Sequence, residues 1–410
     1  MLLFRLRISS KNISTDTHKK PSVNPFNYSF LNHATQPPAT ALQIALPSKQ
    51  LIIQPAIETC EKIEKIELSK EEEEIYGNRM IKGFHKILLL GKGGCAVVWK
   101  ASKESKLYAI KQIARKAENA LSNIQSLKIE FEMYNKIKKI THCGQKNIAE
   151  IYDIIEEKND FWYVAELGGL SLGRQIFRIK GEFVNSERVY GIKHLKLHSL
   201  LTTNSNMIKQ LLRNILIGLD LMQEAGIVHG DIKPENILVE YKDTTITDVK
   251  IIDLGSAFSF DKPSNIRMST PEYLSPEALI YFGSSAFQES KNSIELCKHQ
   301  KPWSYDMWSL GAIVLEIYIG FPLWLSLKGK ICNNDYVFFS KGLFAVAGRE
   351  GKKIVQLQMS MLSNLNAYLK KYHVIMPSSA LNLLLRMMEF DPMKRISPKE
   401  ALAHEFLSIQ

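Results

Sequence analysis

The sequence predicts an α+β protein with two unequal lobes: a first lobe with a five-stranded antiparallel sheet and one main helix, and a mostly helical second lobe. Between about residues 84 and 166, short β-forming runs alternate with turn residues around one helical stretch. After residue 166 the apolar residues recur at helical spacing in longer segments. A chain of 410 residues is long enough for both lobes and a tail.

The expected elements follow in order along the chain. The strands of the first lobe are predicted at 86–90, 96–100, 107–111, about 148–155 and about 161–166, with the helix at about 118–139. The clearest helices of the second lobe are predicted at 208–224, 308–319 and 380–388. The longest apolar stretch, 308–327, is interrupted by Glu316, Gly320 and Pro322, so it predicts a buried core helix followed by a loop rather than a transmembrane segment.

The N-terminal part differs in composition from the rest. Residues 1 to about 55 are rich in Ser, Thr, Asn and Pro without sustained periodicity, which is typical of a disordered tail. Near-helical apolar spacing at 57–75 predicts a short helix, which either docks on the folded domain or stays solvated. We therefore expect a disordered extension at 1–80, a first lobe at 84–166 and a second lobe at 167–408. A transit peptide at the basic start is the less favoured alternative.

Charge and cysteine usage limit the function classes. The formal net charge of +11 is explained by a lysine-rich surface, and no basic run with interleaved aromatics points to a nucleic-acid partner. The five cysteines are scattered and never form a C-x-x-C pair, which argues against a disulfide framework or a zinc site. We expect a monomeric catalytic domain in a reducing compartment, cytoplasmic or nuclear.

Four polar residues in two nearby segments, 228–236 and 250–255, indicate a phosphoryl-transfer chemistry. They are Asp231, Lys233, Asn236 and Asp253. Such a reaction needs a carboxylate to orient a hydroxyl and accept its proton, and a cation to offset charge on the transferring group. It also needs an amide and a second carboxylate as ligands for Mg²⁺.

The two segments, H-x-D-x-K-x-x-N and D-x-G, resemble the catalytic and metal-binding loops of eukaryotic protein kinases. The stretch 269–277 is similar to that family's substrate-site loop, 305–311 to its central helix, and Arg395 to the arginine that pairs with Glu277. The resemblance runs from about residue 84 to the C-terminus and implies the bilobal protein kinase fold.

The resemblance also implies an activity and residue roles. A lysine two positions after the aspartate is similar to serine/threonine kinases, which transfer the γ-phosphoryl of ATP, with Mg²⁺, to a protein substrate. Asp231 would be the catalytic base and Lys233 the cation at the γ-phosphate. Asn236 and Asp253 would be the metal ligands, and Thr270 would bond to Asp231 and Lys233.

A glycine-rich turn and a lysine form the expected nucleotide side. The turn contains Gly91, Lys92, Gly93 and Gly94, and glycines let backbone amides approach phosphate oxygens closely. Alone it is better explained as an ordinary hairpin turn. Together with Lys111 in the next strand, which can reach the α- and β-phosphates, it becomes a strong indication of a nucleotide site.

Lys111 needs a carboxylate to position it, and the predicted helix offers Glu130 and Glu132. Glu130 lies on the same helix face as Leu127 and Tyr134, at spacings of three and four residues. Glu132 lies about 200° around the helix from Glu130. We therefore predict Glu130 to face inward as the ion-pair partner of Lys111 and Glu132 to face solvent.

The segment 162–169 resembles the strand and hinge that bind adenine through their backbone, which assigns Glu166 and Leu167 to the hinge. By the same match Ala165 guards the pocket behind the adenine. Its small side chain predicts that bulky purine analogues are accepted. The side chains expected to sandwich the ring are Val98, Ala109 and Leu238.

Five positions depart from the family pattern. Gly230 stands in place of arginine before the catalytic aspartate, Leu254 in place of phenylalanine, and Ala96 in place of the third glycine; the other two, Ser269 for glycine and Ser275 for alanine, are small replacements. The missing arginine normally binds phosphate on the activation segment, so we expect activity that is independent of such phosphorylation. Extra sequence near 181–200 and 281–302 is interpreted as variable surface loops. A dual-specificity kinase and a nucleotide-binding pseudokinase scaffold remain the alternatives.

Overall fold

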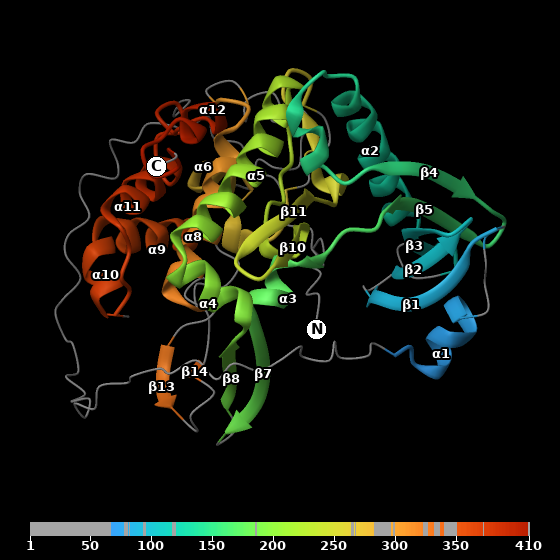
Figure 1. The fold of residues 1–410 in the computed structure, drawn as a ribbon, viewed down its shortest axis with the longest axis horizontal. Helices are drawn as coiled ribbons and strands as arrows, with labels where there is room; N and C mark the ends of the chain where they lie inside the picture. The colour runs from blue at the N-terminus through green and yellow to red at the C-terminus, as the bar shows by residue number, and fades with distance from the viewer. Residues whose placement is uncertain are drawn as a thin grey trace, which may run out of the picture. The chain divides into compact units, whose positions relative to one another are not determined.

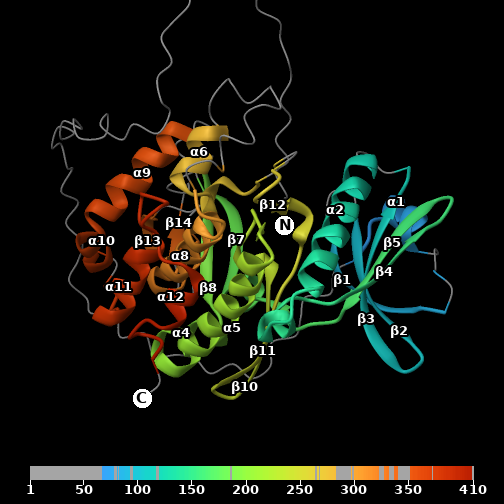
Figure 2. The same cartoon turned by 90° about the horizontal axis from the view of Figure 1, so that it is seen from above.

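The computed structural model describes residues 67–77, 81, 83–92, 96–116, 120–184, 187–263, 266, 268–282, 297, 300–322, 327–331, 337–339, 351–371 and 373–408. All of them belong to one compact unit, Ile57–Gln410. The tail predicted at 1 to about 55 lies outside the described residues. The elements are shown in Figure 1 and, from above, in Figure 2.

The first lobe contains a five-stranded antiparallel sheet in the order β1-β2-β3-β5-β4. Its strands are β1 His85–Lys92, β2 Val97–Lys103, β3 Lys106–Ala114, β4 Ile151–Glu156 and β5 Asp160–Glu166. This confirms the predicted fold class for the first lobe. The β3–β5 register places Lys111 opposite Tyr163 and Ala109 opposite Ala165. It therefore determines which side chains are neighbours on this face of the sheet.

The main helix of this lobe, α2 Ala120–Lys138, lies beside the sheet in both views (Figures 1 and 2). Its buried face carries Ile124, Leu127, Met133 and Ile137, which belong to the same core as Phe161 of β5. Apolar residues at these helical spacings bury one face and leave the other to solvent. Glu130 lies on the buried face.

A short segment before the sheet also belongs to the first lobe. It consists of the helix α1 Lys70–Glu72, capped by Ser69, and the π-helical turn η2 Glu73–Gly77. Tyr76 is buried against Leu89 and Val97 of the sheet. The sequence left open whether the predicted helix at 57–75 docks on the folded domain or stays solvated. The described residues of this segment dock on the sheet. The rest of that range lies outside the described residues.

The second lobe is mostly helical, as predicted, and is organised around the buried helix α8 Ser304–Ile319. Its other helices are α3 Leu172–Ile176, α4 Lys196–Thr203, α5 Ser205–Glu224, α6 Pro276–Phe282, α9 Gly351–Ser363, α10 Leu365–Lys371, α11 Ser378–Met387 and α12 Pro398–Leu402. Among the described residues no helix is long and apolar enough to cross a membrane.

Short strands and 3-10 turns of the second lobe carry the site loops. They are β6 Leu170–Ser171, β9 Ile227–Val228, η4 Pro234–Asn236, β10 Ile237–Lys242, β11 Thr245–Ile251, η5 Leu254–Ser256, β12 Phe258–Ser259 and η6 Pro271–Tyr273. A further 3-10 turn, η3 Cys143–Asn147, leads into the fourth strand of the first lobe. The pairings β9–β12 and β10–β11 fix where the loops between these strands lie.

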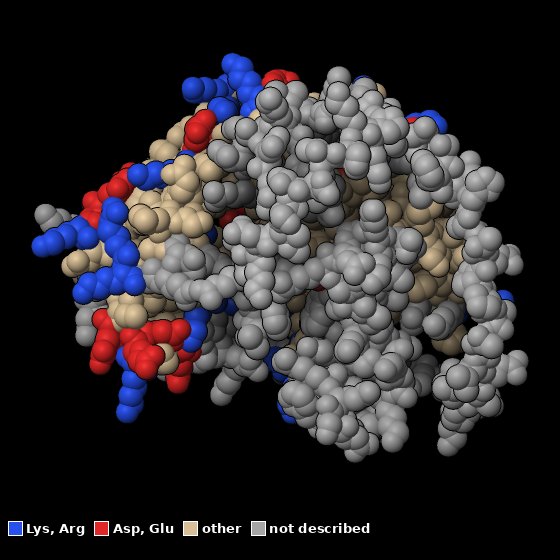
Figure 3. Space-filling view, turned by 180° about the vertical axis from the view of Figure 1, so that it is seen from behind, with Lys and Arg blue, Asp and Glu red and all other residues tan. Residues whose placement is uncertain are grey.

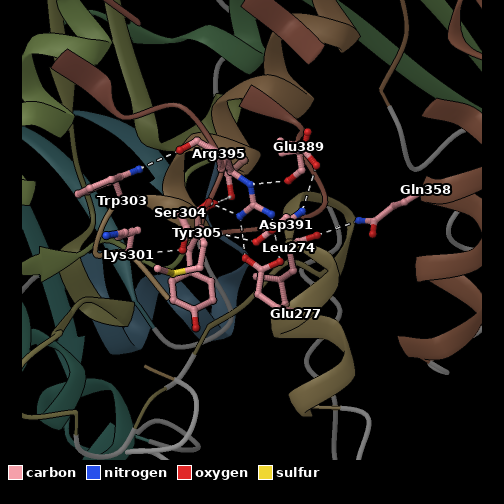
Figure 4. Close-up of polar contacts among 12 residues, drawn as sticks. Leu274, Glu277, Lys301, Trp303, Ser304, Tyr305, Gln358, Glu389, Asp391 and Arg395 are labelled. Atoms are coloured by element: carbon pink, nitrogen blue, oxygen red, sulfur yellow. Dashed lines mark hydrogen bonds and ion pairs between the residues drawn. The ribbon is translucent and has the colours of Figure 1, made fainter. Parts of the chain in front are cut away.

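A buried ion pair ties the start of α6 to the C-terminal part of the chain (Figure 4). The guanidinium of Arg395 donates to both carboxylate oxygens of Glu277, at 2.7 and 3.1 Å, and also to the carbonyl of Ser304. Arg395 is only 2% exposed. A buried arginine is stable only when its donors are satisfied, and the bidentate geometry satisfies them. The expected pairing of Arg395 with Glu277 is therefore present.

The extra sequence near 181–200 has regular structure. The strands β7 Phe177–Val184 and β8 Glu187–His194 form a hairpin, followed by α4. With β13 Leu327–Ile331 and β14 Val337–Phe339 they make a four-stranded sheet in the order β13-β14-β8-β7. The interpretation of this stretch as a loop was wrong, because an inserted hairpin finds pairing partners in a distant part of the chain. Most of 281–302 lies outside the described residues.

Charged residues of both signs lie side by side on the described surface in Figure 3, at the end of the molecule formed by α1 and the sheet. Ion pairs among the described residues of the first lobe include Lys128 with Glu156 at 2.6 Å and Lys138 with Glu150 at 3.0 Å. Exposed pairs of this kind contribute little to stability. In these described pairs, positive and negative charges neutralise each other locally.

Candidate active site

The loop that carries Asp231 is held by a buried carboxylate from α8. Asp306 accepts the peptide N–H of His229 at 2.8 Å and that of Gly230 at 3.0 Å. Burial raises the pKa of Asp306, and the two N–H donors act against that rise. The His229 ring accepts the Asp231 N–H through Nδ1 and contacts the carbonyl of Ile252 through Nε2 at 3.0 Å. The loop backbone is thereby fixed from both sides.

Asp231 lies at the centre of a short polar network. The ammonium of Lys233 donates to Asp231 Oδ2 at 2.5 Å, and the hydroxyl of Thr270 donates to Asp231 Oδ1 at 2.7 Å. Lys233 also donates to Thr270 Oγ1 at 3.1 Å. The amide of Asn236 donates to the carbonyl and to Oδ2 of Asp231, at 2.8 and 3.2 Å. A carboxylate held by three neighbours in this way can accept a proton from a hydroxyl placed beside it.

Thr270 and Asp253 take backbone conformations that L-residues rarely adopt. Their φ angles are 57° and 67°, in the left-handed region. Non-glycine residues in this region are uncommon and occur mostly where surrounding contacts fix them. For Thr270, Pro271 at the start of the next turn and the bond to Asp231 provide those contacts.

The donor set of Asn236 and Asp253 fits a hard divalent cation. Asn236 uses its amide nitrogen within the protein, and its amide oxygen has no partner among the described residues. Burial raises the pKa of Asp253, but the charges of Lys111 and Lys233 outweigh it, so the net pKa is lowered. Asp253 therefore stays ionised, as an oxygen ligand for Mg²⁺ must.

Lys111 of β3 lies within the electrostatic reach of both acids on the nucleotide side. Burial lowers its pKa, but the charges of Asp253 and then Glu130 outweigh burial, and the net pKa is raised. No ion pair or hydrogen bond directly joins the described side chains of Lys111 and Glu130. The two acids and the lysine from distant parts of the chain do come together, but without the direct pair that we expected.

Glu130 is 4% exposed, whereas the side chain of Glu132 is 63% exposed and pairs with Lys136 at 3.2 Å. This is the arrangement that the helical periodicity predicts. Burial raises the pKa of Glu130 to about 7, against the lowering effects of Lys111 and of the hydroxyl of Tyr163. Its Oε1 accepts the Tyr163 hydroxyl at 2.7 Å. The Leu254 amide also lowers its pKa, yet Oε2 is buried without a hydrogen bond of ordinary geometry.

A second contact joins α2 to the loop after Asp253. The hydroxyl of Ser126 donates to the carbonyl of Gly255 at 3.0 Å. A Cβ on Gly255 would lie 2.7 Å from that hydroxyl, so a larger residue there would displace the hydroxyl and break this bond. The position of α2, and with it of Glu130, therefore depends on the loop that carries Asp253.

Three of the residues expected around adenine lie on neighbouring interior strands of the first-lobe sheet, β2, β3 and β5. Ala165 is opposite Ala109, and Val98 is opposite Lys111. Leu238 touches the hinge, since a Cβ on Gly168 would be 2.8 Å from it.

The hinge itself can bind a base. Glu166 is anchored by Lys250 at 2.8 Å and by the amide of Glu150 at 3.0 Å. Within the described residues the peptide groups of Leu167 and Gly168 make no backbone hydrogen bond, so they are available to a base.

The glycine-rich turn is only partly described. Gly91 and Lys92 end β1, while Gly93 and Gly94 lie outside the described residues. Lys92 pairs with Glu72 of α1 at 2.6 Å. Sequence reasoning missed Glu72, Ser126 and Tyr163. Only Tyr163 had a signal, because it lies two residues before Ala165 in a strand and so faces the same side.

Comparison with known proteins agrees with this geometry. The family described as "Protein kinase domain" matches residues 84–407. The mitogen-activated protein kinase hog-1 of Neurospora crassa is 29% identical over 284 residues, covering 67% of this chain and 66% of the relative. The mitogen-activated protein kinase hog1 of Aspergillus clavatus is 30% identical over 291 residues, covering 67% of this chain and 65% of the relative. The chain thus spans slightly less than two thirds of these relatives' length. With more than half of its residues matched by the family, this chain belongs to the protein kinase domain family.

Proposed function

We propose that the chain is an ATP-dependent serine/threonine protein kinase that transfers the γ-phosphoryl group of MgATP to a protein hydroxyl. The observation that carries the proposal is the network of Asp231, Lys233 and Thr270, with donor–acceptor distances of 2.5 to 3.1 Å. It supports a base, a cation and a bridging hydroxyl at one point, which is what in-line transfer to a hydroxyl requires.

The roles follow from the chemistry of each group. Asp231 orients the substrate hydroxyl and accepts its proton, and Lys233 offsets charge on the transferring group. Lys111 binds the α- and β-phosphates. Asn236 and Asp253 would hold Mg²⁺, which neutralises charge on the nucleotide phosphates.

The nucleotide and the protein substrate would enter from different sides of the site. Adenine is proposed to lie between Val98, Ala109 and Leu238 and to bond to the hinge at Glu166 and Leu167, with Ala165 behind it. Gly91–Gly94 would cover the phosphates. Protein substrates are the proposed partners of a monomeric chain, and a cytoplasmic or nuclear location is the proposal for its site of action. The names of the relatives favour a kinase of the mitogen-activated type.

A kinase assay on a degenerate peptide array tests the activity. The wild type should phosphorylate peptides with serine or threonine at the acceptor position, and Asp253→Asn should remove the signal. Labelled tyrosine peptides would favour the dual-specificity alternative. Nucleotide binding without any peptide labelling would favour the pseudokinase alternative and overturn the proposal.

We further propose that activity does not need phosphorylation of the activation segment. Gly230 has no side chain to bind a phosphate, and its φ of +74° and a Cβ position 3.0 Å from the Ser256 carbonyl disfavour any larger residue. The support for the segment comes instead from backbone contacts, with Phe258 paired to Val228 and the Ser269 amide donating to the Gly230 carbonyl at 3.4 Å. Phosphatase treatment of purified enzyme should leave its rate unchanged, and a loss of activity would contradict the proposal.

A further inference from the structure

Tyr163 neighbours both Lys111 and Glu130, the two groups on which the nucleotide side depends. Its ring belongs to β5, directly opposite Lys111 of β3, and the side chains of such a pair lie on the same face of a sheet. Its hydroxyl donates to Glu130 Oε1 at 2.7 Å. Tyr163 is only 7% exposed, and Glu130 is the one hydrogen-bond partner of its hydroxyl among the described residues. The hydroxyl therefore serves this carboxylate alone.

The Tyr163 hydroxyl gives the Glu130 carboxylate the hydrogen-bond donor that a direct contact with Lys111 would otherwise give. A buried carboxylate needs donors to remain ionised, and Lys111 is not bonded to Glu130. With Oε1 held by Tyr163, the free oxygen Oε2 is the one that remains for the ammonium. Lys111 and Glu130 affect each other's pKa, and the β3–β5 register places Lys111 beside the tyrosine that holds Glu130.

We propose that Tyr163 is a positioning residue, which holds Glu130 through its hydroxyl and so sets where Lys111 meets the nucleotide phosphates. The inference rests on the proposed function, since it concerns the binding of MgATP. It predicts that the hydroxyl matters for nucleotide affinity and matters little for the protein substrate. It also predicts that the hydroxyl has no effect once Glu130 is uncharged.

The alternative is that Tyr163 only fills the core between β5 and α2. A hydroxyl that merely completes the packing would affect stability, and its removal would lower the activity towards both substrates in proportion to the folded fraction. The loss would then be the same for MgATP and for the peptide. Tyr163 and Glu130 are in direct contact, so their substitutions are expected to be coupled in either case, and the difference between the two substrates distinguishes the two roles.

The experiment measures the Kd of MgATP by calorimetry, and KM for MgATP and for a peptide, on four full-length proteins. These are the wild type, Tyr163→Phe, Glu130→Gln and the double variant. We expect Tyr163→Phe to raise the Kd and KM for MgATP about tenfold, as expected for losing a hydrogen bond to a charged group. The KM for peptide should stay within about twofold. In the Glu130→Gln background, Tyr163→Phe should change the Kd by less than about twofold.

Tyr108→Phe is the matched control. Tyr108 lies on the same strand as Lys111, but its ring packs against Phe84 and Tyr152 in a separate cluster. Removing its hydroxyl should leave the Kd for MgATP unchanged. Thermal unfolding of each variant confirms that the folded fraction is equal at the assay temperature.

Three results overturn the inference. They are an unchanged Kd in Tyr163→Phe, additive effects of the two substitutions, and tighter MgATP binding in Tyr163→Phe. The last would mean that the hydroxyl competes with Lys111 for Glu130 instead of positioning it. A wild type that neither binds MgATP nor labels peptide would overturn the proposed function itself, and that outcome is distinct from the other three.

Discussion

The two halves of the site are held together by different means. Around Asp231, hydrogen bonds of 2.5 to 3.2 Å connect Lys233, Thr270 and Asn236 directly. On the nucleotide side, no ion pair joins the described side chains of Lys111, Glu130 and Asp253 to one another, although their charges shift each other's pKa values. The catalytic half is complete in itself, and the nucleotide half still has an oxygen without a partner.

The difference has a physical reason. The catalytic half must hold one carboxylate in one orientation, and a network among protein groups does this without a ligand. The nucleotide half must bind several negative phosphate oxygens, and a lysine already locked in a short ion pair would have to give up that pair. Leaving Lys111 coupled only by charge keeps it available. Substitutions in the two halves should therefore have different effects on the reaction rate and on nucleotide binding.

The largest effect is expected at the catalytic half. Asp231→Asn keeps the size of the side chain but removes the proton acceptor, so kcat should fall about 10³-fold. The Kd for MgATP should stay within about threefold, since Asp231 belongs to the other half. Rapid-quench kinetics and calorimetry measure the two quantities. Asp153→Asn, at an exposed position of β4, is the control. A full rate in Asp231→Asn would mean that another group accepts the proton.

The adenine end of the nucleotide half should respond to size rather than charge. Ala165→Met adds a long side chain opposite Ala109, where a bulky purine inhibitor would place its substituent. The potency of that inhibitor should fall about 10- to 100-fold, because overpacking of a filled pocket typically costs this much. The unsubstituted parent compound is the control and should lose little. Equal potency of the bulky inhibitor against both proteins would contradict a cavity behind Ala165.

The raised pKa of Glu130 predicts that the stability of the folded protein depends on pH. Its pKa is raised by burial from 4.5 to about 7, so between these values the folded protein binds a proton that the unfolded chain has released. This extra proton stabilises the folded state at low pH, and the stabilisation is lost as the pH rises through 7. Wild type should lose stability relative to Glu130→Gln between pH 5 and pH 8, on the order of 2 kcal/mol.

Urea unfolding at both pH values measures this difference. Glu132→Gln, at an exposed position two residues along the same helix, is the control and should follow the wild type. Parallel stabilities of wild type and Glu130→Gln over this pH range would show that Glu130 titrates normally, and that the nucleotide half is better satisfied than its geometry indicates.

The parts of the site that the sequence could predict are those formed by short segments of the chain. Asp231, Lys233, Asn236 and Thr270 lie in two short segments whose residue types and order already specify their contacts. The inward direction of Glu130 followed from helical spacing alone. These features are local, so the sequence determines them without knowledge of the tertiary structure.

The features that sequence reasoning missed are all non-local. The contact of Tyr163 with Glu130 needs the β3–β5 register and the position of α2 at once. The hairpin β7–β8 becomes part of a sheet only because β14, far along the chain, pairs with it. Neither a register nor a distant partner is encoded in a single segment, which is why a strand pair was interpreted as a surface loop.

The smallest effect is expected where the nucleotide half meets the segment before the kinase domain. Lys86 of β1 anchors this segment by donating to the Tyr76 carbonyl at 2.7 Å and to Gln112 at 2.9 Å, with its ammonium over the rings of Trp99 and Trp162. The segment in turn presents Glu72 to Lys92 at the start of the glycine-rich turn, 2.6 Å away. The pair is partly exposed, so it is worth little in stability.

Glu72→Gln should free the ammonium of Lys92 and lower the KM for MgATP about twofold, because the added positive charge attracts the nucleotide. The effect should disappear at high ionic strength, where exposed charges are screened. Glu71→Gln, the exposed neighbour, is the matched control and should leave the KM unchanged. A higher KM in Glu72→Gln would mean that the pair orders the turn for binding, and the nucleotide half would then be partly assembled by contacts from outside the family domain.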